Sequence, residues 1–301
     1  NFVAKLDISQ LAFDERLKID FGAFGSSQQD EKIFDIQALS YSTAAMNPTL
    51  PFHKTGNGWQ RNGNASQIGP TEPLLFERND EKNLTFNSHL QLSLQLTHNL
   101  HLAALGSYSY TSTENGRFAP TWVWAQGLAY RGERKTEDIL GNISLDWKYR
   151  WGINKLSTTI LAEYQKKKIA AFWTQVKGLT NNYFGYDNLG AASDRPYGGT
   201  GSSYADPSLT SFMGTLTYTL LDRYTLNLTT RADGSSMVGK DHTWGIFPSI
   251  SATWDMKKES FLRNNKSISL LNLRTGYGRS GNLGGISSYL TLRQYIPVGL
   301  I

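Results

Sequence analysis

The chain has 301 residues, of which 39% are hydrophobic and 12% aromatic, and it carries a formal net charge of +5. The absence of cysteine excludes a disulfide framework and a thiolate metal site. The basic excess is small and its longest run is Lys166, Lys167 and Lys168, so the charge does not favour nucleic acid as a partner.

Alternation of apolar and polar residues is the main signal along the chain, and it predicts β-strands. In residues 84–96 nearly every second side chain is apolar, and the pattern resumes after a short turn at His98 and Asn99. This spacing is typical of a β-hairpin. Eleven strands are predicted in this way, at residues 1–9, 14–25, 82–96, 100–111, 126–149, 155–175, 208–221, 223–234, 242–256, 268–279 and 288–296.

Two of the segments between these strands have a character of their own. Residues 31–46 place Ile33, Ile36 and Leu39 near helical spacing, and Asn47-Pro48 ends the run, so we expect a short helix there. Residues 190–207 are rich in Gly and Ser and lack apolar periodicity. That composition predicts a mobile surface loop.

The connections alternate in length along the chain. Short ones fall near 10–13, 97–99, 150–154 and 221–223, with a medium one at 257–267, and longer ones lie at 26–81, 112–125, 176–207, 235–241 and 280–287. In an antiparallel sheet the short connections then share one end. Short periplasmic turns and long outer loops are typical of outer-membrane barrels, whose strands need only about 10 alternating residues. The chain has no stretch of about 18 apolar residues, which is the length that a membrane-spanning helix needs.

Trp244 and Trp254 lie on the same face of one predicted strand, with Ile246 and Ile250 between them. Ten residues at about 3.3 Å span about 33 Å, and a barrel tilt reduces this to about 25 Å, the height of the apolar band of a membrane barrel. The two tryptophans are therefore predicted to mark the two lipid–water interfaces. A long strand of a soluble, carbohydrate-binding β-sandwich is the alternative. In the barrel, these residues should face lipid: Leu90, Leu92, Leu94, Leu226, Leu228, Ile246, Ile250 and Leu271.

Several longer sequence motifs resemble those of a known family. They are RADGSS at 231–236, WGIFPS at 244–249, LNLRTGYGRSGN at 271–282, and NPTLPF at 47–52 followed by Gly58 and Trp59. Together they resemble the barrel of the SusC/RagA family of TonB-dependent transporters. The resemblance implies an all-β antiparallel transmembrane β-barrel of 22 strands, an amino-terminal plug, energy supplied through TonB, and a SusD-like surface lipoprotein lid. It also implies import of glycans or peptides across a Bacteroidetes-type outer membrane.

No plug or TonB-contacting segment is recognisable in the chain, and eleven strands would be about half of such a barrel. We therefore expect residues 1–301 to be part of a single transmembrane β-barrel domain and an internal piece of a longer protein. The two ends of the chain should then lie at opposite edges of a curved, open half-sheet, which further strands would complete.

Residues with catalytic or metal-binding spacing are scarce. Only His98 and His101, of five histidines, are close in sequence, and their spacing across a turn points the rings to opposite faces. No cysteine nucleophile or Gly-x-Ser-x-Gly elbow is present. We therefore predict that the chain is not an enzyme and binds no metal or cofactor. The alternative is an outer-membrane esterase or protease barrel. Arg231 and Asp233 could contact solute; more simply, Asp233 caps a turn, Gly234 supplies positive φ and Arg231 points into a polar lumen.

Solute contacts are predicted in two of the outer loops. Sugars pack their C–H faces on aromatic rings, with polar neighbours for the hydroxyls. Trp122 and Trp124 lie near Asn115 and Arg117 in one loop. The other loop offers Tyr183, Tyr186, Tyr197 and Tyr204, with Asn181, Asn182, Asp187 and Asp194 nearby. The alternative is that these aromatics pack the loops against each other or against a lid protein.

Overall fold

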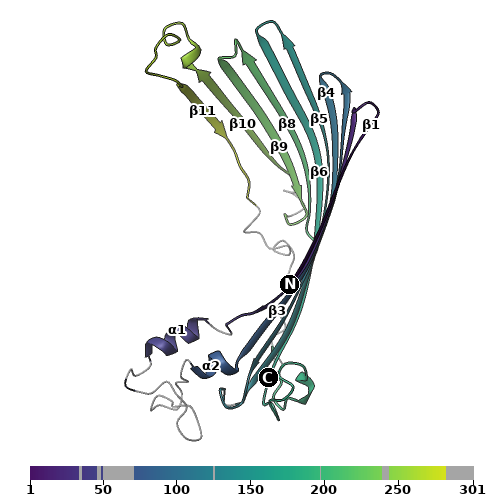
Figure 1. Ribbon diagram of the computed structural model, residues 1–301, viewed down its shortest axis with the longest axis vertical. Coiled ribbons are helices and arrows are strands. Elements are labelled where there is room, and N and C mark those ends of the chain that lie inside the picture. The colour runs from purple at the N-terminus through teal and green to yellow at the C-terminus, as the bar shows by residue number, and fades with distance from the viewer. Residues whose placement is uncertain are drawn as a thin grey trace.

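The computed structural model describes residues 1–33, 36–45, 49, 71–124, 126–196, 198–238 and 244–282. Its strands form one antiparallel sheet that is curved and open (Figure 1). The elements are β1 (Phe2–Ala12), β2 (Leu17–Glu31), α1 (Ile36–Ala45), α2 (Thr71–Phe76), β3 (Arg78–Thr97), β4 (Leu100–Ala119), β5 (Leu128–Trp151), β6 (Asn154–Lys177), η1 (Leu189–Ala191), β7 (Thr200–Ala205), β8 (Ser208–Leu220), β9 (Tyr224–Ser235), β10 (Trp244–Asp255), η3 (Met256–Lys258) and β11 (Asn272–Gly278). Neither α1 nor α2 is long and apolar enough to cross a membrane.

Neighbours in the sheet follow the order of the sequence. The order is β1-β2-β3-β4-β5-β6-β8-β9-β10-β11, and β7 pairs with β6 beside β8. β1 and β11 therefore form opposite edges, which confirms the expected open half-sheet for the strands described; the predicted strand 288–296 lies outside the described residues. All eleven described strands belong to this one sheet, so the β-sandwich alternative is wrong.

The two ends of the sheet differ as predicted. The turns at 13–16, 98–99, 152–153 and 221–223 lie at the short-turn end, which is at the top of Figure 1. α1, α2 and the coil that follows β6 lie at the other end, here called the outer end. The helix predicted at 31–46 is confirmed as α1, but it begins later because β2 continues to Glu31.

The strands β2, β3 and β4 extend farther toward the outer end than the alternation predicted. β3 begins at Arg78 and β4 continues to Ala119, so most of the predicted loop 112–125 is strand, and only 120–127 connects β4 to β5. In these extensions both faces carry polar residues, as at Glu114 and Asn115 on β4, which pair with Glu133 and Gly132 on β5. The backbone hydrogen bonds between strands continue there, but apolar and polar residues no longer alternate along the strand.

The Gly- and Ser-rich segment 190–207 also contains a strand that we did not predict. β7 pairs with residues 169–174 of β6. β6 is 24 residues long, whereas β8 pairs only with its first part, up to Lys166. β7 occupies the backbone edge of β6 that β8 leaves exposed, and an exposed edge is a site for unwanted strand pairing.

Buried residues concentrate at the outer end of the sheet. Ala129 and Val176, on β5 and β6, pack with Ala192 from the coil after β6, and Leu179, Tyr186 and Leu189 pack around them. Elsewhere most large apolar side chains of the described strands are open on one face of the sheet. A single sheet without a second layer can keep such a face only against another apolar medium.

Candidate functional site: the two faces and the outer end of the sheet

The cross-strand register separates the sheet into an apolar face and a polar face. One row pairs Leu216, Leu228, Ile250 and Tyr277 across β8 to β11. The adjacent row, on the opposite face, pairs Thr215, Thr229 and Ser249. The face that carries Leu228 is called the apolar face below, and the face that carries Thr229 is called the polar face.

The residues predicted to point outward lie together on the apolar face. Leu90 on β3 is joined to Trp244 on β10 by a continuous row of paired residues: Gly106, Gly141, Tyr164, Thr210 and Gly234. Leu90, Leu228, Ile246 and Ile250 are all exposed in the single sheet. Alternation along each strand places Leu92, Leu94 and Leu226 on the same face, and Leu271 precedes β11.

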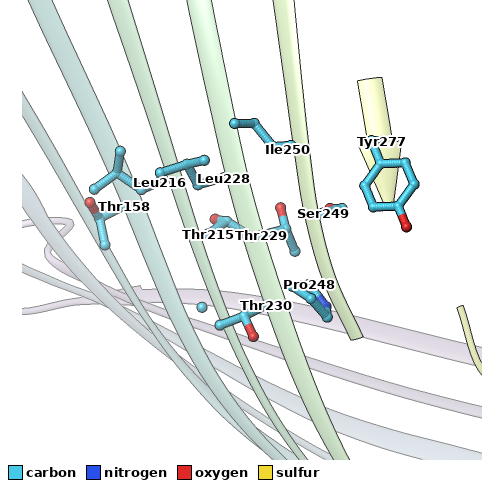
Figure 2. Close-up of a pocket in the computed structure, with 11 residues that line it drawn as sticks. Thr158, Thr215, Leu216, Leu228, Thr229, Thr230, Pro248, Ser249, Ile250 and Tyr277 are labelled. Carbon is cyan, nitrogen blue, oxygen red and sulfur yellow. The ribbon is translucent and has the colours of Figure 1, made fainter. Parts of the chain in front are cut away.

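A hollow of about 510 Å³ lies in the apolar face near its middle (Figure 2). It follows the row of small or compact residues Gly214, Thr230 and Pro248, beside the larger Leu228 and Ile250. Its apolar lining offers little to bind a hydroxyl-rich solute. The hollow suits an acyl chain better than a hydroxyl-rich solute.

Aromatic side chains of the apolar face gather toward both ends of the leucine-rich zone. Trp254 stacks on Tyr224 at 6.2 Å between ring centroids, at the short-turn end. At the other end of β10, Trp244 stacks on Phe212 at 5.9 Å. Further stacked or tilted pairs at the short-turn end are Trp147–Tyr149, Tyr149–Trp151 and Trp151–Tyr218. The two tryptophans thus lie at opposite ends of the leucine-rich zone, and their place at the lipid–water interfaces stays a prediction.

Hydrogen bonds between side chains cover much of the polar face. Gln165 Nε2 donates to both carboxylate oxygens of Asp138 at 3.0 Å. Thr217 Oγ1 donates to Asn227 Oδ1 at 2.8 Å. Similar bonds join Ser109 to Asn87, Thr113 to Asn83, Asn115 to Glu81 and Thr159 to Asp146. Hydroxyl, amide and carboxylate groups on this face are compatible with a water-filled lumen.

Arg231 connects three residues of one row on the polar face. Glu163, Ser211 and Asp233 pair across β6, β8 and β9. The Arg231 guanidinium donates to Asp233 Oδ1 at 2.7 Å and to Ser211 Oγ at 3.0 Å, and its Nη2 lies 3.6 Å from Glu163 Oε1. Arg231 lies on the polar face, and its exposure to a lumen stays a prediction. The expected positive φ at Gly234 is wrong, because Gly234 is an extended residue of β9 covered by Trp244: an added Cβ would lie 2.8 Å from the indole.

Trp122 and Trp124, in the connection between β4 and β5, contact the segment around α2. Trp122 meets Phe76 edge to face at 5.8 Å, and Trp124 Nε1 donates to Glu77 Oε1 at 2.5 Å. Both indoles are partly exposed, at 49% and 42%. Figure 1 shows α1 and α2 on the concave side of the sheet, so these tryptophans border the concave side at its outer end.

Tyr186 is held against the apolar face of the sheet. Its hydroxyl donates to Asp80 Oδ2 and accepts from Arg78 Nη2 at 3.3 Å. Its ring covers Gly116, where an added Cβ would lie 2.5 Å away. Asp80 and Gly116 are cross-strand partners that lie on the apolar face beyond its leucine-rich zone. Sequence reasoning missed this contact because Tyr186 and Asp80 are 106 residues apart.

The other predicted tyrosines occupy different places. Tyr183 is 88% exposed and contacts only Phe184 among the ring pairs described, edge to face at 5.1 Å. Tyr204 is on β7 and pairs with Ala170 of β6. Tyr197 lies outside the described residues. The two predicted loops do meet, because Asn182 Oδ1 accepts from Thr121 N and Asn182 Nδ2 donates to Thr121 Oγ1, both at 3.0 Å.

The contact between Tyr186 and Asp80 predicts a pH-dependent loop. Burial, and then the hydrogen bond to Asp80, raise the pKa of Tyr186 to about 12. A phenol whose folded pKa is raised contributes stability that is present below its usual pKa near 10 and is lost between about 10 and 12. A nitroxide label on Asn188→Cys should therefore become more mobile from about pH 9.5 to about pH 12. With Tyr186→Phe, which cannot ionise, this mobility should hardly change over that range; equal pH responses would contradict the assignment.

Metal-binding groups of three or more His, Asp or Glu residues are absent from the part of the chain that the structure describes. His101 is on β4, on the polar face, and His98 is in the turn before it. The pair is therefore split between a strand and a turn.

Comparison with known proteins gives this geometry a family. The family model described as "TonB dependent receptor-like, beta-barrel" matches residues 20–297. TonB-dependent receptor P3 of Formosa agariphila is 26% identical over 94% of this chain and 29% of that protein. TonB-dependent receptor SusC of Bacteroides thetaiotaomicron is 45% identical over 28% of this chain and 9% of that protein.

The solved structure of the RagAB peptide transporter has the same fold over 92% of this chain and 32% of that chain, with a TM-score of 0.70 and 14% sequence identity. This chain thus spans about a third of the length of the relatives that it matches over most of its residues. The family match covers nearly the whole chain, and its members are proteins of the outer membrane. The chain therefore belongs to the TonB-dependent receptor-like β-barrel family of bacterial outer-membrane proteins.

Proposed function

We propose that residues 1–301 are part of a single transmembrane β-barrel domain that imports glycans or peptides across the outer membrane. The sheet forms about half of the barrel wall. A plug, the segment that contacts TonB and the remaining strands belong to other parts of the full-length protein. TonB supplies the energy through the plug, and a SusD-like lipoprotein covers the outer end.

The opposite chemistry of the two faces is the observation that carries this proposal. Leu216, Leu228 and Ile250 form a row on the apolar face, and Thr215, Thr229 and Ser249 form the next row on the other face. A barrel closed by further strands would place the leucines against lipid and the hydroxyls around the lumen, with Trp244 and Trp254 at the two interfaces. A polar solute could then cross the membrane without meeting the apolar face.

Two lines of support favour a glycan or a peptide over an apolar solute. The polar face presents amide, hydroxyl and carboxylate groups, which hydrogen-bond to hydroxyls and peptide groups. Among the similar proteins of known structure, RagAB is a peptide transporter. The experiment therefore includes both solute classes.

Trp122 and Trp124 are the strongest of the proposed solute contacts. They border the concave side and are partly exposed, so an indole face is available to a sugar ring or an apolar peptide side chain. Tyr183 and Tyr204 are exposed and remain candidates, equally suited to contact the lid. Tyr186 is better explained as a loop anchor because its hydroxyl is bonded to Asp80.

The test uses the full-length protein in its own host. Deleting the gene should abolish uptake of labelled oligosaccharides or of labelled peptides, and uptake should also be lost when the inner-membrane proton gradient is collapsed. Trp122→Ala and Trp124→Ala should each lower uptake several-fold at equal surface expression, with Tyr164→Ala, on the apolar face, as the control aromatic variant. If uptake of both solute classes persists unchanged in the deletion strain, the proposed transport is wrong.

If the deletion abolishes uptake but Trp122→Ala, Trp124→Ala, Tyr183→Ala and Tyr186→Ala all leave it unchanged, the transport proposal stands. These aromatics are then excluded as the solute site.

A further inference from the structure

The connection between β10 and β11, residues 256–271, differs from the other connections at the short-turn end. It has 16 residues, whereas the turn between β3 and β4 has two and the turn between β1 and β2 has four. It begins with η3 and continues as hydrogen-bonded turns, visible at the top left of Figure 1. Reversing the chain direction between antiparallel strands needs only a few residues. The additional residues therefore call for another explanation.

Glu259 fixes this connection to the apolar face of the sheet. Its Oε1 accepts from Tyr224 Oη at 2.6 Å and from Trp254 Nε1 at 3.1 Å, and its Oε2 lies 3.1 Å from Arg223 Nη1. Tyr224 and Trp254 are cross-strand partners on the apolar face, where their rings stack. The connection thus lies over the aromatic residues that end the leucine-rich zone of the apolar face.

Lysine side chains hold the connection in a defined shape. Lys257 Nζ donates to three backbone carbonyls, of Leu262 at 3.1 Å, Arg263 at 3.4 Å and Asn265 at 2.6 Å. Lys258 Nζ donates to the carbonyl of Asp222 at 2.7 Å and lies 3.0 Å from Asp255 Oδ2. One lysine closes the turn on itself and the other ties it to the adjacent turn and strand. The connection is therefore hydrogen-bonded both within itself and to the adjacent turn.

This ordered segment nevertheless exposes large apolar side chains. Phe261 is 65% exposed and Leu270 is 69% exposed. Its basic residues are Lys257, Lys258, Arg263 and Lys266, and Glu259 is its only acidic residue, so its formal charge is +3. Apolar side chains beside positive charge, next to an aromatic girdle, are the combination that binds the interface of an anionic membrane.

We infer that residues 256–271 form an interfacial anchor, which binds anionic phospholipid headgroups of the leaflet at the short-turn end. Phe261 and Leu270 enter the boundary between headgroups and acyl chains, and Arg263 and Lys266 lie near the lipid phosphates. This inference rests on the proposed function, because it takes its orientation from the apolar face being in lipid. It assigns the connection a role in setting the depth and tilt of the barrel at this point.

The test measures the depth of nitroxide labels in the full-length protein, reconstituted in vesicles of phosphatidylethanolamine with or without phosphatidylglycerol. This chain contains no cysteine, so a single Cys can be introduced, with any cysteine elsewhere in the protein replaced. Phe261→Cys is the test position. His98→Cys, exposed in the two-residue turn at the same end, is the aqueous control, and Leu228→Cys is the lipid control. Depth is read from the relative accessibility to oxygen and to a water-soluble nickel complex.

We expect the label at position 261 to be accessible to oxygen several-fold more than to nickel, at a depth between those of the two controls. In the Arg263→Gln, Lys266→Gln background this label should move toward water in the vesicles that contain phosphatidylglycerol. In vesicles without phosphatidylglycerol the same two substitutions should change its depth less.

Three outcomes would overturn the inference. A label at 261 as accessible to nickel as the label at 98 would place the connection in water. A label at 261 inaccessible to both reagents would show Phe261 packed against another part of the protein. A depth at 261 that is unchanged by the two glutamine substitutions would remove the role of the phosphates. If the label at 228 is itself accessible to nickel rather than oxygen, the proposed orientation of the barrel fails first.

Discussion

Arginine in place of Leu228 is expected to prevent most of the protein from assembling in the membrane, whereas arginine in place of Thr229 is expected to be tolerated. Leu228 lies between Leu216 and Ile250 on the apolar face, near the middle of the zone that Trp244 and Trp254 bracket. An arginine on the lipid face of a barrel costs about 2–4 kcal/mol at the bilayer midplane. That is a large part of the stability of a typical folded domain.

Thr229 makes a matched control because it is the next residue of the same strand. It pairs with Thr215 and Ser249 on the polar face, where an arginine can remain hydrated. Both variants should be compared in the full-length protein by heat-modifiable electrophoretic mobility and by urea unfolding in lipid vesicles. Equal loss of folded protein in the two variants would contradict the assignment of the faces. Greater loss with Thr229→Arg would reverse it.

The second large effect is expected at Arg231, on the polar face. Arg231→Met removes two hydrogen bonds and leaves Glu163 and Asp233, which lie in one row with Ser211, without their shared cation. Hydrogen bonds to charged groups contribute about 1.5–3 kcal/mol, but the Arg231 side chain is 36% exposed, so we expect a loss of about 1–3 kcal/mol after allowing for solvent screening. Urea unfolding of the reconstituted protein measures it.

Two further variants separate charge from geometry at this site. Arg231→Lys keeps the positive charge but cannot bond Asp233 and Ser211 at once with a planar fork, so it should recover only part of the loss. Adding Glu163→Gln to Arg231→Met removes one of the two carboxylates and should also recover part. A stability equal to the original protein in Arg231→Met would show that the three contacts contribute nothing measurable.

Much of the sheet could be predicted from the sequence because its signal is local. Ten of the eleven described strands correspond to predicted ones, and the opposite faces of Leu228 and Thr229 follow from alternation alone. The candidate site was less predictable. Trp122 and Trp124 were found from their residue type, but their contacts with Phe76 and Glu77 join segments that are more than 40 residues apart. Neither segment has a periodic pattern from which this contact could be predicted.

The sequence by itself determined which chemistry each face of the sheet presents. Successive residues of a strand point to opposite faces. Because Leu228 and Thr229 are neighbours in one strand, one of them faces the apolar side and the other the polar side. The same rule set the spacing of Trp244 and Trp254. Only neighbouring residues and the pleat of the strand enter this inference, and both are fixed before any tertiary contact forms.

The tertiary structure alone decided how the two ends of the sheet are finished. The continuation of β3 to β6 beyond the apolar zone, the pairing of β7 with β6, and the placement of Tyr186 on Asp80 depend on partners far apart in the chain. The hydrogen bond between Glu259 and Tyr224 likewise joins residues 35 positions apart. In these regions both faces are polar or the backbone is irregular, so no single-strand pattern specifies the partner. Hydrogen bonding and burial between segments select it only once the sheet is in place.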